Sequence, residues 1–188
     1  MTAQDPRPLA GEPLSVDLLN TRWTDGAAAH DLLESTAGLA VWLDSPTVAD
    51  ALVGRDVRAD RATLDALLAA RSALAEAVES SDGPGAPAAR AALNEVLAHG
   101  RLRLRLDADG PAQSVETDDA AWLPAWAAVR DWLRLLGDRP DRIRACAGPE
   151  CVLHFYDTSK NGTRRWCSMA GCGNRAKASR HYARRRQD

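Results

Sequence analysis

Hydrophobic residues along the first 140 positions recur partly with helical and partly with extended spacing. Apolar stripes at three- and four-residue intervals predict four helices, at about 30–44, 60–79, 87–98 and 119–136. Strict alternation in RLRLRLD, residues 101–107, predicts a strand that returns through the turn DADGP to a second strand at 113–117. The stretch 14–23 predicts a buried element of undetermined type. The fold class expected from this pattern is α+β, a mainly helical domain with a small β-hairpin.

Two of these elements give specific expectations about burial. The first helix would place Leu32, Leu39 and Leu43 on its buried stripe and end at Ser45, because the residue before a proline is disfavoured in a helix. In the alternating strand, one face should be buried and the other should meet water. The side chains expected to point inward are Leu102, Leu104 and Leu106, with Arg101, Arg103 and Arg105 outside.

The fourth helix carries the clearest apolar stripe, which consists of Trp122, Trp126, Val129, Leu133 and Leu136. Thr117 or Asp118 is the expected N-cap, and Gly137 the expected stop. Three tryptophans, at positions 122, 126 and 132, could line a ligand pocket, but large aromatic residues at helical spacing are more often core. We therefore expect core.

Charge divides the chain into two regions of opposite sign. Residues 141–188 hold eleven Lys and Arg against four acidic residues, a net charge of +7, which leaves −9 for the rest of a chain whose total is −2. Such asymmetry favours a basic tail that meets a polyanion. A basic segment that pairs with the acidic region of its own chain explains the charge equally well.

Composition and the absence of targeting signals indicate the class of protein and its expected location. Hydrophobic residues make up 45% and charged residues 27%, which is typical of globular proteins. No membrane-length apolar run and no secretory signal are apparent, so a cytoplasmic location is expected. Thiols are mostly reduced there, which favours metal binding over disulfides for the cysteines.

All four cysteines lie between residues 146 and 172, spaced Cys146-x4-Cys151-x15-Cys167-x4-Cys172. Two close pairs separated by about fifteen residues indicate a four-thiolate structural zinc site. An iron–sulfur cluster and disulfides are weaker alternatives, and His154 and His181 could replace a ligand. Four thiolates leave no vacancy for a catalytic water, and no phosphate loop or nucleophile motif is present. We therefore expect a Zn²⁺ protein that is not an enzyme.

The chain around these cysteines predicts a small finger. VLHFYDTSKNGTRRW, residues 152–166, has the pattern of a strand, a turn and a return strand, and the segment after Cys172 that of a helix. Trp166 and Met169 would form a miniature core. We expect a treble-clef-like finger at 141–188, behind an α+β domain at 1–140.

The helix after Cys172 is the candidate nucleic-acid interface. Arg and Lys can bind phosphate or guanine edges, and Asn can read adenine. The expected contacts are Asn174, Arg175, Lys177, Arg180 and Arg184, with Arg164 and Arg165 on phosphate. These charges could instead only solubilise the finger. DNA is the favoured partner, although a basic finger also serves RNA.

These residues resemble the CGNR zinc-finger family. The agreement comprises Cys172-Gly173-Asn174-Arg175, the preceding Arg164-Arg165-Trp166-Cys167-Ser168-Met169, and Ala176-Lys177, together with Cys146, Cys151, Phe155, Asp157 and Ser159. The upstream region, including LSVDLLNT at 14–21, is similar to the ABATE domain that accompanies this finger. The resemblance implies a bacterial stress-induced transcription regulator with a zinc-binding, DNA-contacting finger.

The resemblance implies less about the upstream domain, which would be a sensor of a small effector or a homodimerisation module. The alternative function is a protein-interaction or ligand-sensing module whose zinc finger is purely structural. Neither reading involves a membrane.

Overall fold

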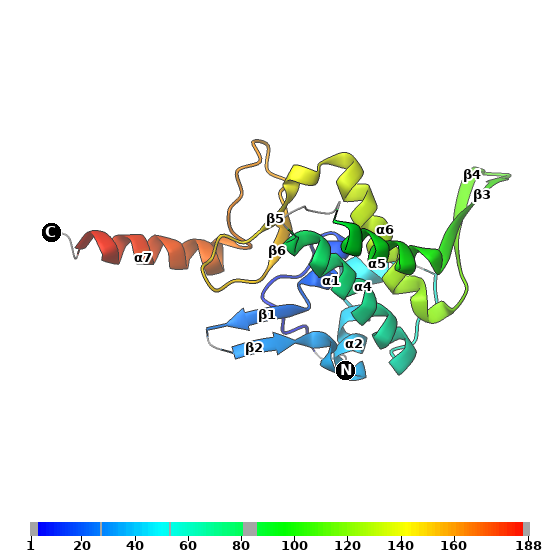
Figure 1. The fold of residues 1–188 in the computed structure, drawn as a ribbon, viewed down its shortest axis with the longest axis horizontal. Coiled ribbons are helices and arrows are strands. Elements are labelled where there is room, and N and C mark those ends of the chain that lie inside the picture. Colours follow the sequence, from blue (N-terminus) through cyan, green and yellow to red (C-terminus); the bar gives the residue numbers. More distant parts are fainter. Residues whose placement is uncertain (1–3, 27, 53, 81–85, 186–188) are drawn as a thin grey trace.

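The computed structural model describes residues 4–26, 28–52, 54–80 and 86–185. A helical body contains most of the core, and two features project from its opposite ends, the hairpin β3–β4 and the helix α7 (Figure 1). The helices are α1 (Leu14–Leu19), α2 (Thr36–Leu43), α3 (Pro46–Ala51), α4 (Arg61–Glu79), α5 (Pro87–Ala98), α6 (Leu123–Asp138) and α7 (Asn174–Arg185). The strands are β1 (Arg22–Asp25), β2 (Ala28–Asp31), β3 (Gly100–Asp107), β4 (Gly110–Thr117), β5 (Ile143–Ala145) and β6 (His154–Tyr156). They form three separate antiparallel pairs, β1–β2, β3–β4 and β5–β6.

The central helices α4, α5 and α6 pack against one another and bury the apolar stripes that the sequence presents. Asp60 caps α4 by accepting a 3.0 Å hydrogen bond from the backbone N–H of Thr63. Leu67 and Leu74 of α4 are fully buried. The helices predicted at 60–79 and 87–98 are confirmed. No helix among the described segments combines the length and apolar character needed to cross a membrane.

The first predicted helix is wrong over its first third. Residues Ala28–Asp31 form β2, a short 3-10 turn follows at Leu32–Glu34, and only Thr36–Leu43 are α-helical. The Ser35 side chain accepts a hydrogen bond from the Gly38 N–H at 3.2 Å and caps α2 there. The undetermined stretch 14–23 divides into α1 and the start of β1.

The fourth predicted helix is confirmed, but its ends and its stripe differ from expectation. Asp119, rather than Thr117 or Asp118, caps the 3-10 turn Ala120–Trp122 that precedes α6. The helix continues through Gly137 to Asp138. Trp126, Trp132 and Leu135 are buried, as the core interpretation of the tryptophans predicts, whereas Leu133 is 46% exposed. Trp122 stacks on His99 with ring centroids 3.6 Å apart.

The predicted hairpin is confirmed, but the predicted burial of its leucines is wrong. Strands β3 and β4 pair in continuous register from Gly100↔Thr117 to Asp107↔Gly110. Leu102, Leu104 and Leu106 are 42%, 75% and 80% exposed. The physical reason is that this two-stranded sheet extends beyond the helical body, so that nothing in the described chain covers its apolar face (Figure 1).

Candidate metal centre and nucleic-acid interface

The four cysteines converge on one point. Their sulfurs all lie within 4.8 Å of one another. The Sγ atoms of Cys151 and Cys167 are 3.8 Å apart, and those of Cys167 and Cys172 are 3.6 Å apart. A tetrahedral metal with S ligands at about 2.3 Å requires S···S separations of about 3.8 Å. A disulfide needs about 2.05 Å, and all four thiols are free. The sulfur geometry therefore fits a four-thiolate metal site.

The chain around the cysteines closes tightly over the cluster. A Cβ atom on Gly148 would lie 3.1 Å from the Sγ of Cys172 and 3.1 Å from the Cβ of Cys151, so a side chain here would press on two ligands. The backbone N–H of Cys167 donates to the Sγ of Cys146 at 3.2 Å. Cys146, Cys167 and Cys172 are buried, and Cys151 is half-buried. This closed arrangement suits a structural site rather than one with an open coordination position.

The electrostatics of the sulfurs also fit a cation. Burial raises the pKa of Cys151 to about 11, and the neighbouring Cys146 thiol adds to the rise. Burial and the Cys172 thiol raise the pKa of Cys167 as well. Burial also raises the pKa of Cys172. The Arg175 guanidinium lies 3.1 Å from the Cys172 sulfur and lowers this pKa, as do the other thiols, so that the net shift is downward. Four thiolates this close are stable together only when a cation shares their charge.

The strand arrangement of the finger differs from the prediction. Strand β6 pairs with β5, upstream of the first cysteine, instead of with a return strand at 163–166. The buried Asp157 explains the difference, because its carboxylate accepts backbone N–H groups of Ser159 at 2.9 Å and Arg164 at 3.0 Å and so turns the chain. The segment at 163–166 is held instead by a backbone hydrogen bond that the Ala147 N–H donates to the Arg165 carbonyl.

Specific polar contacts dock the finger onto the N-terminal region. Asn20 makes two 2.9 Å hydrogen bonds to the backbone of His154, one donated and one accepted. Glu12 accepts from the Tyr156 N–H and from the Arg164 guanidinium, both at 2.9 Å. Burial lowers the pKa of His154. Sequence reasoning missed the docking residues Glu12 and Asn20. For Asn20 the available signal was its place as a polar residue inside the apolar motif LSVDLLNT, whereas Glu12 lies before that motif.

Replacing Asn20 with alanine tests this docking. The change leaves the N–H and carbonyl of His154 without partners at a half-buried place, and an unsatisfied buried polar group costs about 1–3 kcal/mol. We expect the free energy of unfolding in urea to fall by about 2 kcal/mol. Asn94, exposed on α5, is the matched control, and Asn94→Ala should change stability by less than about 0.5 kcal/mol. Equal effects of the two variants would contradict the docking role.

The start of α7 is fixed by the cysteine cluster. Ser168 accepts the Gly171 N–H at 3.0 Å and begins the π-type turn Met169–Gly173, which contains Cys172 and leads directly into α7. Asn174, Arg175 and Lys177 are exposed on α7. The side chains of Arg180, Arg184 and His181 lie outside the described residues, although the helix backbone there is described. Met169 is 53% exposed, so its predicted place in a miniature core is wrong.

The two arginines before Cys167 have different environments. The Arg164 guanidinium lies 4.2 Å from the centroid of the buried Phe155 ring and donates to the Cys167 carbonyl at 2.6 Å as well as to Glu12. Arg165 is exposed and lies 5.2 Å from the centroid of the half-buried Trp166 ring. Protein acceptors thus occupy Arg164, whereas Arg165 is available to a ligand.

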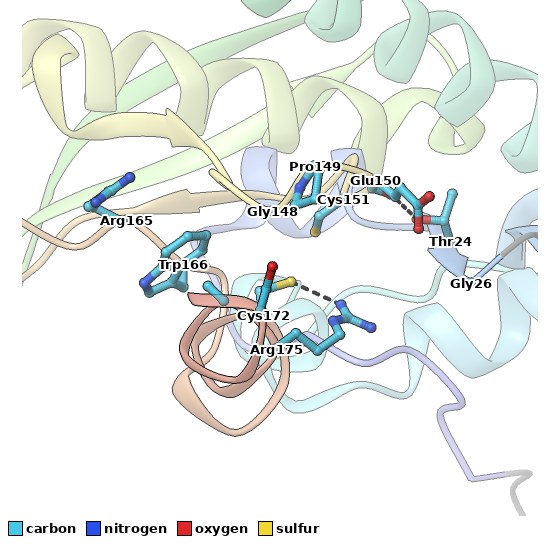
Figure 2. A pocket seen from close by; sticks show the side chains of 12 residues that line it. Thr24, Gly26, Gly148, Pro149, Glu150, Cys151, Arg165, Trp166, Cys172 and Arg175 are labelled. Carbon is cyan, nitrogen blue, oxygen red and sulfur yellow. Dashed lines mark hydrogen bonds between the residues drawn. The ribbon is translucent and has the colours of Figure 1, made fainter. Parts of the chain in front are cut away.

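A cleft of about 500 Å³ lies beside the cluster, between the β1–β2 hairpin, the loop of the first cysteine pair and the first turns of α7. Figure 2 shows Arg165, Trp166 and Arg175 around it, with Thr24 and Glu150 joined by a hydrogen bond on its other side. The cleft therefore brings two arginines and an aromatic ring together at the base of the basic helix.

Both parts of the chain match models of known protein families. Residues 142–185 match the CGNR zinc finger, and residues 12–143 match the ABATE model, described as "Putative stress-induced transcription regulator". No curated protein matched the chain. Since the ABATE match covers well over half of the residues, the chain belongs to the ABATE family and carries a C-terminal CGNR zinc finger.

Proposed function

We propose that this protein is a zinc-dependent transcription regulator that contacts DNA through α7 and the residues beside it. The observation that carries the proposal is the direct continuation of the four-cysteine cluster into an exposed basic helix. Membership in a family described as transcription regulators supports it. Such a regulator would act in the cytoplasm.

Zinc is the metal that best suits four closely packed thiolates, and it would be held by Cys146, Cys151, Cys167 and Cys172. When bound, it supplies structural bracing and compensates the charge of the thiolates. The protein's own residues hold the helix, since Ser168 caps the turn and Arg175 donates to Cys172. Because four thiolates complete a tetrahedral site, we propose a binding protein rather than an enzyme.

The proposed DNA surface consists of Arg165, Asn174, Arg175 and Lys177, with Arg180 and Arg184 further along the helix. The first four are exposed. Arginine and lysine on this surface would bind phosphates and set the register, and Asn174 could read an adenine edge. Arg164 is left out, because its half-buried guanidinium already binds Glu12 and the Cys167 carbonyl. Arg175 is kept although it donates to the Cys172 sulfur, because its side chain is exposed.

A second candidate is a protein-interaction or ligand-sensing module whose finger is purely structural. It is favoured by the docking contacts of Glu12 and Asn20, which tie the finger to its own acidic domain. However, α7 extends away from the helical body (Figure 1), so these contacts do not use the exposed basic helix. The candidates differ in whether that helix binds a polyanion.

Charge removal on α7 tests the proposal with a matched control. Lys177 is exposed on α7, and Lys160 is exposed in the loop after β6. We expect Lys177→Ala to weaken binding to mixed-sequence duplexes and to reduce the slope of log affinity against log salt by about 1. Lys160→Ala should leave both quantities unchanged. Fluorescence anisotropy on the zinc-loaded full chain measures them, and identical behaviour of the two variants would contradict the assignment of the surface to α7.

A further inference from the structure

The projecting hairpin β3–β4 presents a continuous apolar face that the proposed DNA-binding role does not use. The antiparallel register places Leu102 opposite Val115, Leu104 opposite Gln113, and Leu106 opposite Pro111. Among the described residues, half of the exposed large hydrophobic side chains belong to this face, the three leucines. Contiguous exposed apolar patches mark interaction sites, and a hairpin of two strands is only marginally stable alone. The face therefore has the character of an interaction surface.

We propose that the partner is a second copy of this chain, packed leucine face to leucine face across a two-fold axis. The register puts no charged residue on this face, so two copies bring no like charges together. The arginines of the hairpin lie on the other side and form ion pairs within the hairpin. There, Arg101 and Arg103 bind Glu116 at 2.8 and 3.0 Å, and Arg105 binds Asp107 at 3.0 Å.

The chemistry of the face distinguishes this occupant from others. A charged partner such as nucleic acid finds no unpaired ion on the hairpin that would attract it, since its arginines already bind carboxylates. A second hairpin offers an uncharged face of equal length and shape. Leu133, Val152 and Met169, the other exposed large apolar residues of the described chain, lie in α6 and the finger and form no comparable face.

The area of the leucine face limits the expected affinity of the dimer. Eight residues per strand span about 27 Å, and two strands make a face about 10 Å wide, so each copy contributes on the order of 270 Å². Two such faces remain below the roughly 1,200 Å² of a standard stable complex. The dimer should accordingly be weak, with a dissociation constant on the order of 100 μM.

The test is sedimentation velocity of the zinc-loaded full chain from about 5 μM to about 500 μM. The wild type should shift from monomer to dimer over this range. Leu104→Lys combined with Leu106→Lys should remain monomeric, and Leu133→Lys, the same change at an exposed leucine of α6, should dimerise like the wild type. A wild type that is monomeric throughout, or a Leu133→Lys variant that is equally impaired, would overturn the proposal.

Hydrogen exchange provides a second measurement that does not depend on variants. If the hairpins pair, amides of residues 100–117 exchange more slowly as the wild-type concentration rises, while those of α4 do not change. Exchange at 100–117 that is independent of concentration would also overturn the proposal.

Discussion

Replacing Cys167 with serine should remove the metal and release α7 from its fixed position. The Cys167 sulfur lies 3.8 Å from that of Cys151 and 3.6 Å from that of Cys172, and its N–H donates to the Cys146 sulfur. Structural zinc contributes about 10–16 kcal/mol of apparent binding free energy in finger peptides, and that energy is folding energy. Metal analysis should therefore give one zinc per wild-type chain and none for the variant.

Circular dichroism should show a loss of helix in Cys167→Ser, because the turn that leads into α7 contains a ligand of the same metal. The control is Met169→Ala, two residues away and at a 53% exposed position, which should retain both zinc and helix. A chelator should reproduce the Cys167→Ser spectrum in the wild type. A Cys167→Ser chain with full zinc content and unchanged helix would contradict the metal assignment.

Replacing Asp17 with alanine should have the largest effect within the N-terminal domain. Its fully buried carboxylate accepts hydrogen bonds from Arg7 Nη1 at 2.6 Å, the Gly11 N–H at 2.9 Å and Trp42 Nε1 at 3.1 Å. The Arg7 side chain is itself buried, and after the substitution Asp5 is its one remaining acidic partner among the residues that the structure describes. Breaking a buried pair costs about 3–5 kcal/mol.

Urea unfolding followed by tryptophan fluorescence measures this loss. Asp65→Ala is the control, because Asp65 forms an exposed i,i+4 pair with Arg61, and exposed pairs of this kind contribute little to stability. We expect the two variants to differ about tenfold in their effect on the free energy of unfolding. An Asp17→Ala chain as stable as the Asp65 variant would contradict the role of Asp17 in fixing the N-terminal segment.

The parts of the fold that sequence predicts well are those with long, regular patterns. Helix α4 has both a capping aspartate and a complete apolar stripe, so local information is sufficient. Local information is not sufficient for the leucines of β3. Period-two alternation predicts that one face of the strand is apolar, but it does not predict whether another element covers that face, and here the leucines are exposed. The late start of α2 depends on Asp31, which pairs with both β1 and Arg71 instead of continuing a helix.

The candidate site likewise contains residues that the sequence predicts and residues that it does not. Cysteine spacing alone identifies the four convergent sulfurs, because metal ligands in a small finger are close in sequence. The docking residues escape such reasoning, since Glu12 and Arg164 are separated by 152 positions and Asn20 and His154 by 134. The inward orientation of Arg164 likewise depends on the buried Phe155 beneath it.

The most direct test of the central claim, that the metal-braced basic helix binds DNA, is the salt dependence of duplex binding by the zinc-loaded full chain. Binding through several phosphate contacts predicts that log affinity falls linearly with log salt, with a slope of about −0.9 per neutralised phosphate, and that chelation abolishes it. Absence of binding to diverse duplexes at low salt, with zinc present, would contradict the account.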